Sequence, residues 1–354
     1  MSSHCVYKTC EKGLHQSTIG PIYITSKEKH PVDELDLPLY EYEVFEELFD
    51  PLWTDRKARR QRRAKPRHIP KKPRDQIIVE LADDIGVLDE GFHTSYKPSR
   101  HEEGWLLSSL RSFYERGLIS DVLALVRGGK EASVYRCQAD AATGSTVLAA
   151  KVYRPRQFRT MRNDSLYREG RGLLDPYGHD HDYARDQRII RAVRKKTEFG
   201  RQVQHMSWLM HEYTALEQLY QAGAAVPQPI AADENAILMS YHGDAHMPAP
   251  TLDQVSLEPD EAASLFREAL RNIELMLKHD LIHGDLSAYN ILYWEGDIVI
   301  IDFPQVTALY TNSHAYSVLR RDVVRVCEYF ARQGVPCDPE DVLGELWYEY
   351  GYGE

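Results

Sequence analysis

HGDLSAYN at residues 283–290, followed by IIDF at residues 300–303, is the stretch of this sequence that decides the fold. A helical pattern precedes the first segment, and a predicted hairpin ending in an apolar strand leads into the second. Phosphoryl transfer from ATP needs a carboxylate beside the attacking hydroxyl and oxygen ligands for Mg²⁺. Solvated acids in a hairpin loop would not explain this spacing. It therefore predicts a phosphotransferase site in which Asp285 is catalytic and Asn290 and Asp302 bind the metal.

Lys151 and Glu212 form the second part of the predicted site. Lys151 lies in TVLAAKVY, residues 146–153, an apolar strand pattern in which an unpaired charge would be costly. Glu212 lies at helical spacing from Leu209 and Leu216, inside the apolar stripe of a predicted helix. Alone, these residues would fit an edge-strand lysine and a partly exposed acid. Together they match the ion pair that positions nucleotide phosphates in protein kinases.

The third part is GGKEASVY at residues 128–135, between two predicted strands. Backbone amides and a lysine in such a loop can approach phosphates, so the candidates for nucleotide binding are Gly129, Lys130, Ser133 and Val134. A simple hairpin turn explains the Gly-Gly pair equally well. The loop is neither a G-x-G-x-x-G motif nor a Walker loop.

In combination these motifs resemble the RIO-family atypical protein kinases. The K-E-A-x-V-Y loop and S-A-Y-N are most similar to the RIO1 branch, and the resemblance extends over about residues 103–335. It implies a bilobal kinase fold, the use of ATP with Mg²⁺, serine autophosphorylation and work on the small ribosomal subunit. It also implies ATPase activity, in which Asp302 takes up phosphate transiently.

The same resemblance assigns further residues. It implies that Lys151 contacts the phosphates and that Asp322 supports the catalytic loop, residues 283–290. It also implies that the adenine hinge consists of Met239, Ser240 and Tyr241. The sequence departs from ordinary protein kinases after Asp302, because Pro304 stands where a glycine is usual and only about 50 residues follow. The usual activation segment and peptide-docking helices do not fit into that length.

Three regions follow one another along the chain, and together they predict an α+β, bilobal protein-kinase-like fold. Residues 1–102 form a charged extension that we expect to be partly disordered. Residues 103–246 predict the kinase N-terminal lobe with its hinge, and residues 247–354 predict a reduced C-terminal lobe. We expect the highly charged stretch 154–201 to be mobile, and a helix at about 317–332 to close the second lobe.

The charge is unevenly distributed. Residues 56–74 hold 11 Lys or Arg and no acid, whereas the whole chain carries −11, so the remainder carries −22. This basic arm predicts contact with RNA phosphates, which suits ribosomal RNA or a pre-ribosomal particle as a partner. A solvated arm or a targeting signal fits the same composition.

The chain is expected to act in the cytoplasm and away from membranes. It has no run of about 18 apolar residues, and residues 1–24 lack the apolar segment of a secretory signal. Its five cysteines suggest no disulfide framework, which fits a reducing compartment. ATP and Mg²⁺ are the predicted ligands, and the sequence does not identify a protein substrate.

Two other functions fit part of the pattern. Small-molecule phosphotransferases such as aminoglycoside and choline kinases also carry H-G-D-x-x-x-x-N followed by I-D, but the K-E-A-S-V-Y loop and the short C-terminal lobe argue against them. A nucleotide-gated binding factor that times its release from a ribosomal particle would use the same residues with low turnover and no protein acceptor.

Overall fold

The computed structural model describes residues 92, 94–154, 171–179 and 186–351. The basic arm, with most of the predicted N-terminal extension, lies outside these residues. So does part of the stretch that was expected to be mobile.

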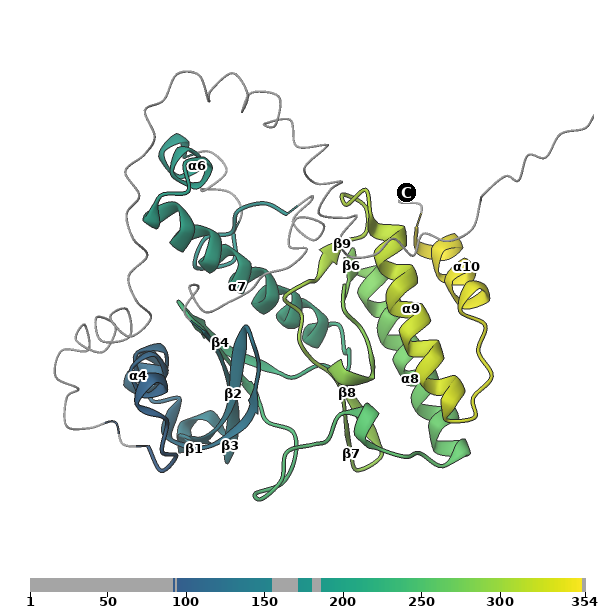
Figure 1. Ribbon diagram of the computed structural model, residues 1–354, viewed down its shortest axis with the longest axis horizontal. Helices are drawn as coiled ribbons and strands as arrows, with labels where there is room; N and C mark the ends of the chain where they lie inside the picture. The colour runs from purple at the N-terminus through teal and green to yellow at the C-terminus, as the bar shows by residue number, and fades with distance from the viewer. Residues whose placement is uncertain (1–91, 93, 155–170, 180–185, 352–354) are drawn as a thin grey trace, which may run out of the picture. The chain divides into compact units, whose positions relative to one another are not determined.

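The first lobe is built on a five-stranded antiparallel sheet (Figure 1). Its strands are β1 (Ile119–Gly128), β2 (Ala132–Ala139), β3 (Val147–Tyr153), β4 (Pro229–Asp233) and β5 (Ala236–Ser240). They lie in the order β1-β2-β3-β5-β4, so β3 is central and pairs with β2 and β5. Because β1, β2 and β3 are joined by short connections, they pair with their sequence neighbours, as the turn signals predicted.

Two helices cover the two faces of this sheet. Helix α4 (Arg100–Glu115) begins at Ser99, which forms a capping box with Glu102. The apolar residues of α4 pack with the sheet residues Ile119, Val122, Tyr135, Leu148 and Leu238. Helix α7 (Glu198–Gln221) packs on the opposite face through Trp208, Leu209 and Met210, against Ile237 and Met239. The sheet is therefore apolar on both faces, and a charge on β3 needs a partner.

The stretch expected to be mobile contains helical residues toward its end. Helix α6 (Gln187–Arg194) is capped by Asp186, and α7 begins ten residues before Trp208, where the sequence first indicated a clear helix. A Cβ atom at Gly200 would lie 2.2 Å from the carbonyl oxygen of Ala192. This close approach joins α6 to α7, and it depends on a tertiary contact that periodicity does not reveal.

The second lobe is mainly helical (Figure 1). It contains α8 (Pro259–Lys278), β6 (Leu281–Ile282), β7 (Ile291–Trp294), β8 (Asp297–Ile300), β9 (Thr307–Ala308), α9 (Ala315–Arg332) and α10 (Pro339–Tyr350). Strands β7 and β8 form the predicted hairpin, and β6 pairs with β9. One hydrophobic cluster joins α8, α9 and α10 to the underside of the hairpin. The α+β, two-lobed kinase-like fold is thereby confirmed.

Two features of the C-terminal end differ from expectation. Helix α10 follows α9, so α9 does not close the lobe. A disulfide joins Cys327 of α9 to Cys337, whose Cα atoms lie 5.6 Å apart, whereas no disulfide was expected. The turn between α9 and α10 brings the two cysteines together, a proximity that their number and spacing did not indicate.

None of the described helices has the length and apolar character that crossing a membrane requires.

Candidate active site

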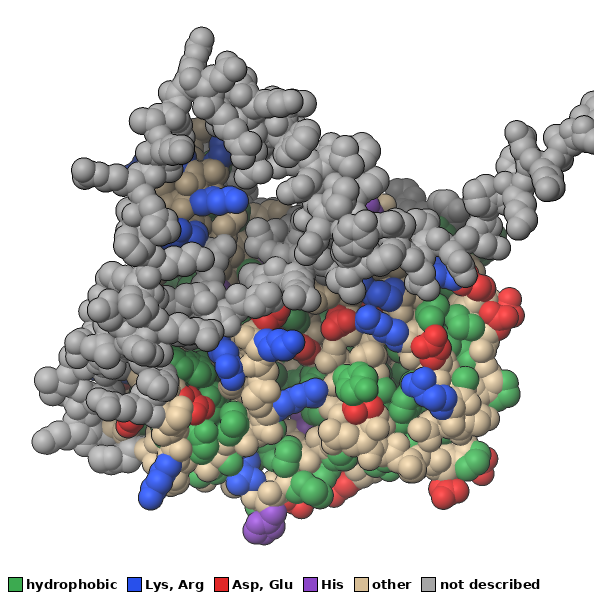
Figure 2. All heavy atoms as spheres, in the orientation of Figure 1, with side chains coloured by type: hydrophobic (Ala, Val, Ile, Leu, Met, Phe, Trp, Pro, Cys, Tyr) green, Lys and Arg blue, Asp and Glu red, His purple; other side chains and the backbone are tan. Residues whose placement is uncertain are grey.

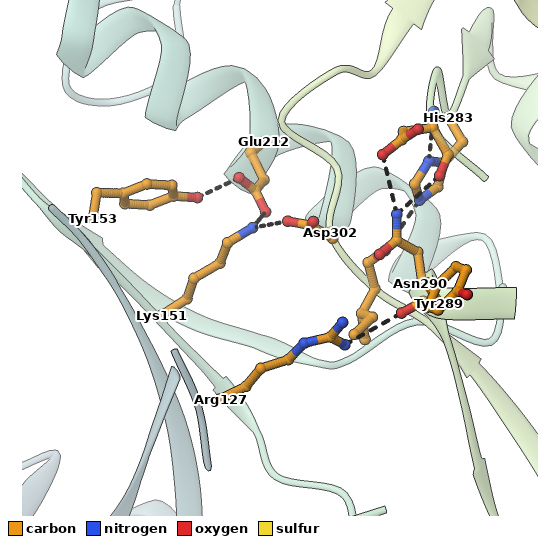
Figure 3. A network of polar contacts seen from close by, with 10 residues as sticks. Arg127, Lys151, Tyr153, Glu212, His283, Tyr289, Asn290 and Asp302 are labelled. Carbon is orange, nitrogen blue, oxygen red and sulfur yellow. Dashed lines mark hydrogen bonds and ion pairs between the residues drawn. The ribbon is translucent and has the colours of Figure 1, made fainter. Parts of the chain in front are cut away.

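Lys151 lies at the junction of the two lobes, between two carboxylates (Figure 3). Its Nζ atom is 2.5 Å from Oε1 of Glu212 on α7 and 2.5 Å from Oδ1 of Asp302 after β8. The second oxygen of Glu212 accepts a hydrogen bond from the hydroxyl of Tyr153. Lys151 is 8% exposed and Glu212 1%, so this is a buried ion pair whose acid is bonded at both oxygens. The predicted Lys151–Glu212 contact is therefore present.

The charges of this group shift one another's proton affinity. Burial by itself lowers the pKa of Lys151, but Asp302 and Glu212 outweigh it and raise that pKa well above its ordinary value. Burial likewise raises the pKa of Asp302, and the ammonium group of Lys151 more than reverses the effect, so the pKa lies below its usual range. Lys151 and Asp302 are therefore both charged at neutral pH.

Asp302 combines an unusual backbone with an accessible side chain. Its φ angle is 72°, in the left-handed region that a non-glycine residue rarely adopts. Its side chain remains 43% exposed although Lys151 holds one oxygen. Strained residues of this kind concentrate at functional sites, where the surrounding structure holds them in place.

Asn290 completes a set of oxygen donors that suits Mg²⁺. Its amide nitrogen donates to the carbonyl oxygen of Asp285 at 2.9 Å, which leaves the amide oxygen as the group for a ligand. The backbone N–H of Ile301 donates to the carbonyl oxygen of Asn290 at 2.9 Å and ties that residue to the strand before Asp302. Across the described ranges, no group of three or more His, Cys, Asp or Glu gathers as a metal cluster. One carboxylate and one amide oxygen fit Mg²⁺, which keeps several waters and takes phosphate oxygens as further ligands.

The catalytic loop is held by backbone contacts to α9. Asp322 is buried, and its two oxygens accept hydrogen bonds from the N–H groups of Gly284, at 2.7 Å, and Leu286, at 3.1 Å. Burial raises the pKa of Asp322 to about 7, although Arg321 and these amides act in the opposite direction. The contacts flank Asp285 on both sides, as the family resemblance implied for Asp322.

Gly284 is required by the tight packing of this loop. Its φ angle is 85°, and a Cβ atom there would lie 2.3 Å from the carbonyl oxygen of Gln305. Any other residue would push the loop away from the segment after Asp302.

Arg325 contacts the carboxylate of Asp285 directly. Its Nη1 atom lies 2.6 Å from Oδ1 of Asp285, while the amide nitrogen of Asn290 lies 3.5 Å from Oδ2. Arg325 and Tyr153 were not among the predicted site residues. Their partners, Asp285 and Glu212, are 40 and 59 positions away in the chain. Asp322 and Arg325 lie one turn apart on α9, and both contact the catalytic loop. This pattern is visible only in the folded chain, where the loop lies along the helix.

His283 connects the catalytic loop to the Asp302 segment. Its Nδ1 atom accepts from the N–H of Asp285 at 3.2 Å, and its Nε2–H donates to the carbonyl oxygen of Ile301 at 3.1 Å. Its ring packs on Phe303 with centroids 4.5 Å apart. Burial lowers the pKa of His283 to about 4, so the ring is neutral in the tautomer that these two contacts need.

The two predicted nucleotide-binding residues of β2, Ser133 and Val134, lie on opposite faces of the sheet. Val134 lies opposite Lys151 in the β2–β3 register, so the two share the face of the sheet that borders the site. Ser133 lies opposite Val152, on the face toward α4, and is buried. Because alternate strand residues point to opposite faces, this placement does not favour the predicted contact of the Ser133 hydroxyl with phosphate.

Gly129 closes a tight turn between β1 and β2. Its N–H donates to the carbonyl oxygen of Ala132 at 2.9 Å, and a Cβ atom at Gly129 would lie 2.7 Å from that same oxygen. Lys130, next in the turn, is exposed. The turn therefore brings backbone and a cation close together, as both the phosphate-loop and the hairpin interpretations require.

The predicted hinge follows the end of β5. Met239 lies opposite Ala149 of β3 and faces the same side of the sheet as Lys151. The backbone N–H of Ser240 donates to the carbonyl oxygen of Gln228 at 2.9 Å, and the Gln228 N–H donates to the Ser240 hydroxyl at 2.9 Å. The guanidinium of Arg136 lies over the ring of Tyr241, with its Cζ atom 5.9 Å from the ring centroid. Of the predicted hinge residues, Met239 thus lies on the face of the sheet that carries Lys151.

Two cations lie at the site although the whole chain is acidic. Arg127 of β1 donates to the carbonyl oxygen of Tyr289 in the catalytic loop at 3.3 Å, and Lys151 lies on the neighbouring side of the site (Figure 3). Elsewhere on the face drawn in Figure 2, basic and acidic side chains are mixed. The two cations favour an anionic ligand at the junction of the lobes.

Comparison with known proteins points to one family. A family model described as RIO1, the RIO domain, matches residues 177–342. The RIO-type serine/threonine-protein kinase Rio1 of Haloferax volcanii is 32% identical over 230 residues, which cover 64% of this chain and 67% of that protein. The Rio1 protein of Methanocaldococcus jannaschii is 30% identical over 63% of this chain and 68% of its own length.

The chain is also similar to RIO kinases from eukaryotes. The human serine/threonine-protein kinase RIO1 is 29% identical over 62% of this chain, which corresponds to 35% of the human protein. Among solved structures, a Rio2 kinase in complex with ADP/Mg²⁺ and phosphoaspartate from Chaetomium thermophilum has a TM-score of 0.46 at 22% identity, over 79% of this chain and 80% of that one.

Proposed function

Because this chain belongs to the RIO-type serine/threonine-protein kinases of the RIO1 branch, we propose that it transfers the γ-phosphoryl group of ATP to serine, with Mg²⁺ as cofactor. The observation that supports this most is the position of Lys151 between Glu212 and Asp302, beside the loop that carries Asp285 and Asn290. Lysine, acids and amide are the groups that phosphoryl transfer needs, and they come from β3, from α7, from the loop at residues 283–290 and from the residue after Ile301.

Each residue of the site has a proposed role. Asp285 orients the attacking hydroxyl and accepts its proton, and Lys151, held by Glu212, contacts the phosphates. Asn290 and Asp302 would hold Mg²⁺, which neutralises phosphate charge as the leaving group departs. The other candidate contacts to the nucleotide are Gly129, Lys130, Val134 and the hinge residues Met239, Ser240 and Tyr241.

Hydrolysis of ATP is a second reaction that the same groups support. In that reaction a carboxylate oxygen of Asp302 forms a bond to the γ-phosphorus and ADP leaves. Water then cleaves the acyl phosphate, which restores the carboxylate and releases phosphate. The side chain of Asp302 is 43% exposed and Lys151 binds its Oδ1, which favours attack by the other oxygen in this alternative. A nucleotide-gated binding factor would use it as a timed switch, whereas family membership disfavours a small-molecule kinase.

The composition of the basic arm bears on the cellular setting. We propose that the protein works in the cytoplasm in maturation of the small ribosomal subunit, with the basic arm at residues 56–74 contacting ribosomal RNA. The division into residues 1–102, 103–246 and 247–354 is likewise retained as a proposal. What supports the setting is the composition of the arm and the family resemblance.

The test is incubation of the purified protein with Mg²⁺ and γ-labelled ATP. Label on the protein that survives hydroxylamine and disappears in Asp285→Ala and Asp302→Ala supports a serine kinase. Released phosphate, with hydroxylamine-sensitive label only, supports the hydrolysis cycle through Asp302. A folded wild-type protein that neither binds nor turns over ATP would overturn both.

Asp297→Ala is the matched control for Asp302→Ala. Asp297 is exposed and lies on the same hairpin, five residues before Asp302. Its removal takes away one surface carboxylate without touching the site, so turnover should remain within about twofold of wild type.

A further inference from the structure

Three side chains of α9 contact the catalytic loop around Asp285. Arg321 donates to the carbonyl oxygen of Gly284, and Asp322 accepts from the N–H groups on either side of Asp285. Arg325, one turn further along the same face, reaches the carboxylate itself. The helix therefore holds the backbone of the loop and also the reactive side chain.

We propose that Arg325 is the positioning residue of the proposed phosphotransferase, fixing the carboxylate of Asp285 by binding Oδ1 and leaving Oδ2 for the acceptor hydroxyl. The inference rests on the proposed function of Asp285. Arg325 acts through Asp285 and needs no contact with ATP or acceptor.

The two oxygens of Asp285 are in different environments. Oδ1 lies 2.6 Å from Nη1 of Arg325, the length of a strong charge-assisted hydrogen bond. Oδ2 lies 3.5 Å from the amide nitrogen of Asn290, beyond the range of a good hydrogen bond. A carboxylate held at one oxygen can rotate little, so the other oxygen points in one direction. Small displacements of a catalytic group reduce the rate strongly, which makes this restraint valuable.

The alternative, that Arg325 only stabilises the fold, does not suit its exposure. The side chains of Arg325 and Asp285 are 39% and 42% exposed, and ion pairs at that exposure contribute little to folding because water screens them. The backbone of the loop is already held by buried Asp322. Loss of Arg325 should therefore leave the fold and the loop in place and release only the Asp285 side chain.

Arg320 provides a control on the same helix. It pairs with Glu340 of α10 at 2.6 Å, and its side chain is 53% exposed. Arg320→Met thus removes a similar ion pair from α9 at a position that faces α10 and lies away from the catalytic loop. The comparison of Arg325→Met with Arg320→Met separates positioning of Asp285 from a general loss of charge or of helix surface.

The experiment measures kcat and KM for ATP, together with Tm and the dissociation constant of ADP, in the full chain with Mg²⁺. Arg325→Met should lower kcat roughly 10- to 100-fold while KM and ADP affinity stay within about twofold, since Arg325 acts on the chemical step. Arg325→Lys, which keeps the cation, should recover part of kcat. Arg320→Met should match wild type within about twofold in all four quantities.

Three results would overturn the proposal. One is an unchanged kcat in Arg325→Met. Another is a raised KM with kcat intact, which would make Arg325 a nucleotide-binding residue. The last is a kcat in Arg325→Lys no better than in Arg325→Met. Absence of turnover in the wild type would instead overturn the proposed function and this inference with it, so the two failures are distinguishable.

Discussion

The two halves of the site are held in opposite ways. On the side of the first lobe, Lys151 and Glu212 are buried, and their positions follow from a strand and a helix that pack together. On the side of the second lobe, Asp285 is half exposed, and α9, some 40 residues away in the chain, fixes it. In the first half Lys151 is also part of the core, so a substitution there should lower activity and stability together. In the second, the reactive side chain can be disturbed with little cost to the fold.

The largest expected effect on stability comes from Lys151→Met. Removing the cation leaves Glu212 charged in the core and removes the partner of Asp302, so the free energy of unfolding should fall by about 3–5 kcal/mol. Urea denaturation measures this. Lys130→Met, at an exposed position, should change stability by less than about 0.5 kcal/mol. Equal stabilities for the two variants would contradict the buried-pair interpretation.

Asp322→Asn tests how firmly the second half is anchored. The amide can accept only one of the two backbone N–H groups, and its own NH₂ group faces the other, so stability should fall by about 3 kcal/mol. The rate of ATP turnover should fall as well, since the loop around Asp285 loosens. Asp341→Asn, at an exposed position of α10, is the control for urea denaturation. A loss no larger than in this control would show that the loop does not depend on Asp322.

His283, which joins the two halves, predicts a pH dependence. Burial lowers its pKa from 6.5 to about 4, so between these values the unfolded chain binds the proton and the folded one does not. Stability is therefore lost as the pH falls below about 6.5, and by pH 5 the loss amounts to about 2 kcal/mol. His283→Gln should lack this loss.

The measurement is the difference in free energy of unfolding between wild type and His283→Gln at pH 8 and pH 5. Asp322, whose pKa is raised to about 7, contributes with the opposite sign, but it is present in both proteins and cancels. A difference that is independent of pH would show that His283 titrates normally.

The smallest expected effect is that of Tyr153→Phe. The hydroxyl donates to the second oxygen of Glu212, and its removal should cost about 1 kcal/mol, because that oxygen is left buried without its donor. Thermal and urea unfolding measure the change. Tyr177→Phe removes a hydroxyl from a side chain that is 80% exposed and should be neutral. If the two variants behave alike, Tyr153 does not hold Glu212.

Much of the fold was predictable because its signals are local. Alternation and turn residues predicted β1, β2, β3 and the β7–β8 hairpin, and helical periodicity predicted α8, α9 and the part of α7 around Glu212. Helix α6 and the first turns of α7 were missed, because Gly200 packs against Ala192 only in the folded chain. Helix α10 and the Cys327–Cys337 disulfide were missed for a similar reason, since both depend on how the chain turns after α9.

The sequence by itself determined the family of this protein and the residues proposed to carry its chemistry. The spacing of Asp285, Asn290 and Asp302, together with a lysine in an apolar strand, indicates these residues, because strand, hairpin and helix patterns are local properties of the chain. Only the tertiary structure decided how these groups are held. The contacts of Arg325 to Asp285 and of Tyr153 to Glu212 join residues far apart in the chain, and packing in three dimensions selects such pairs.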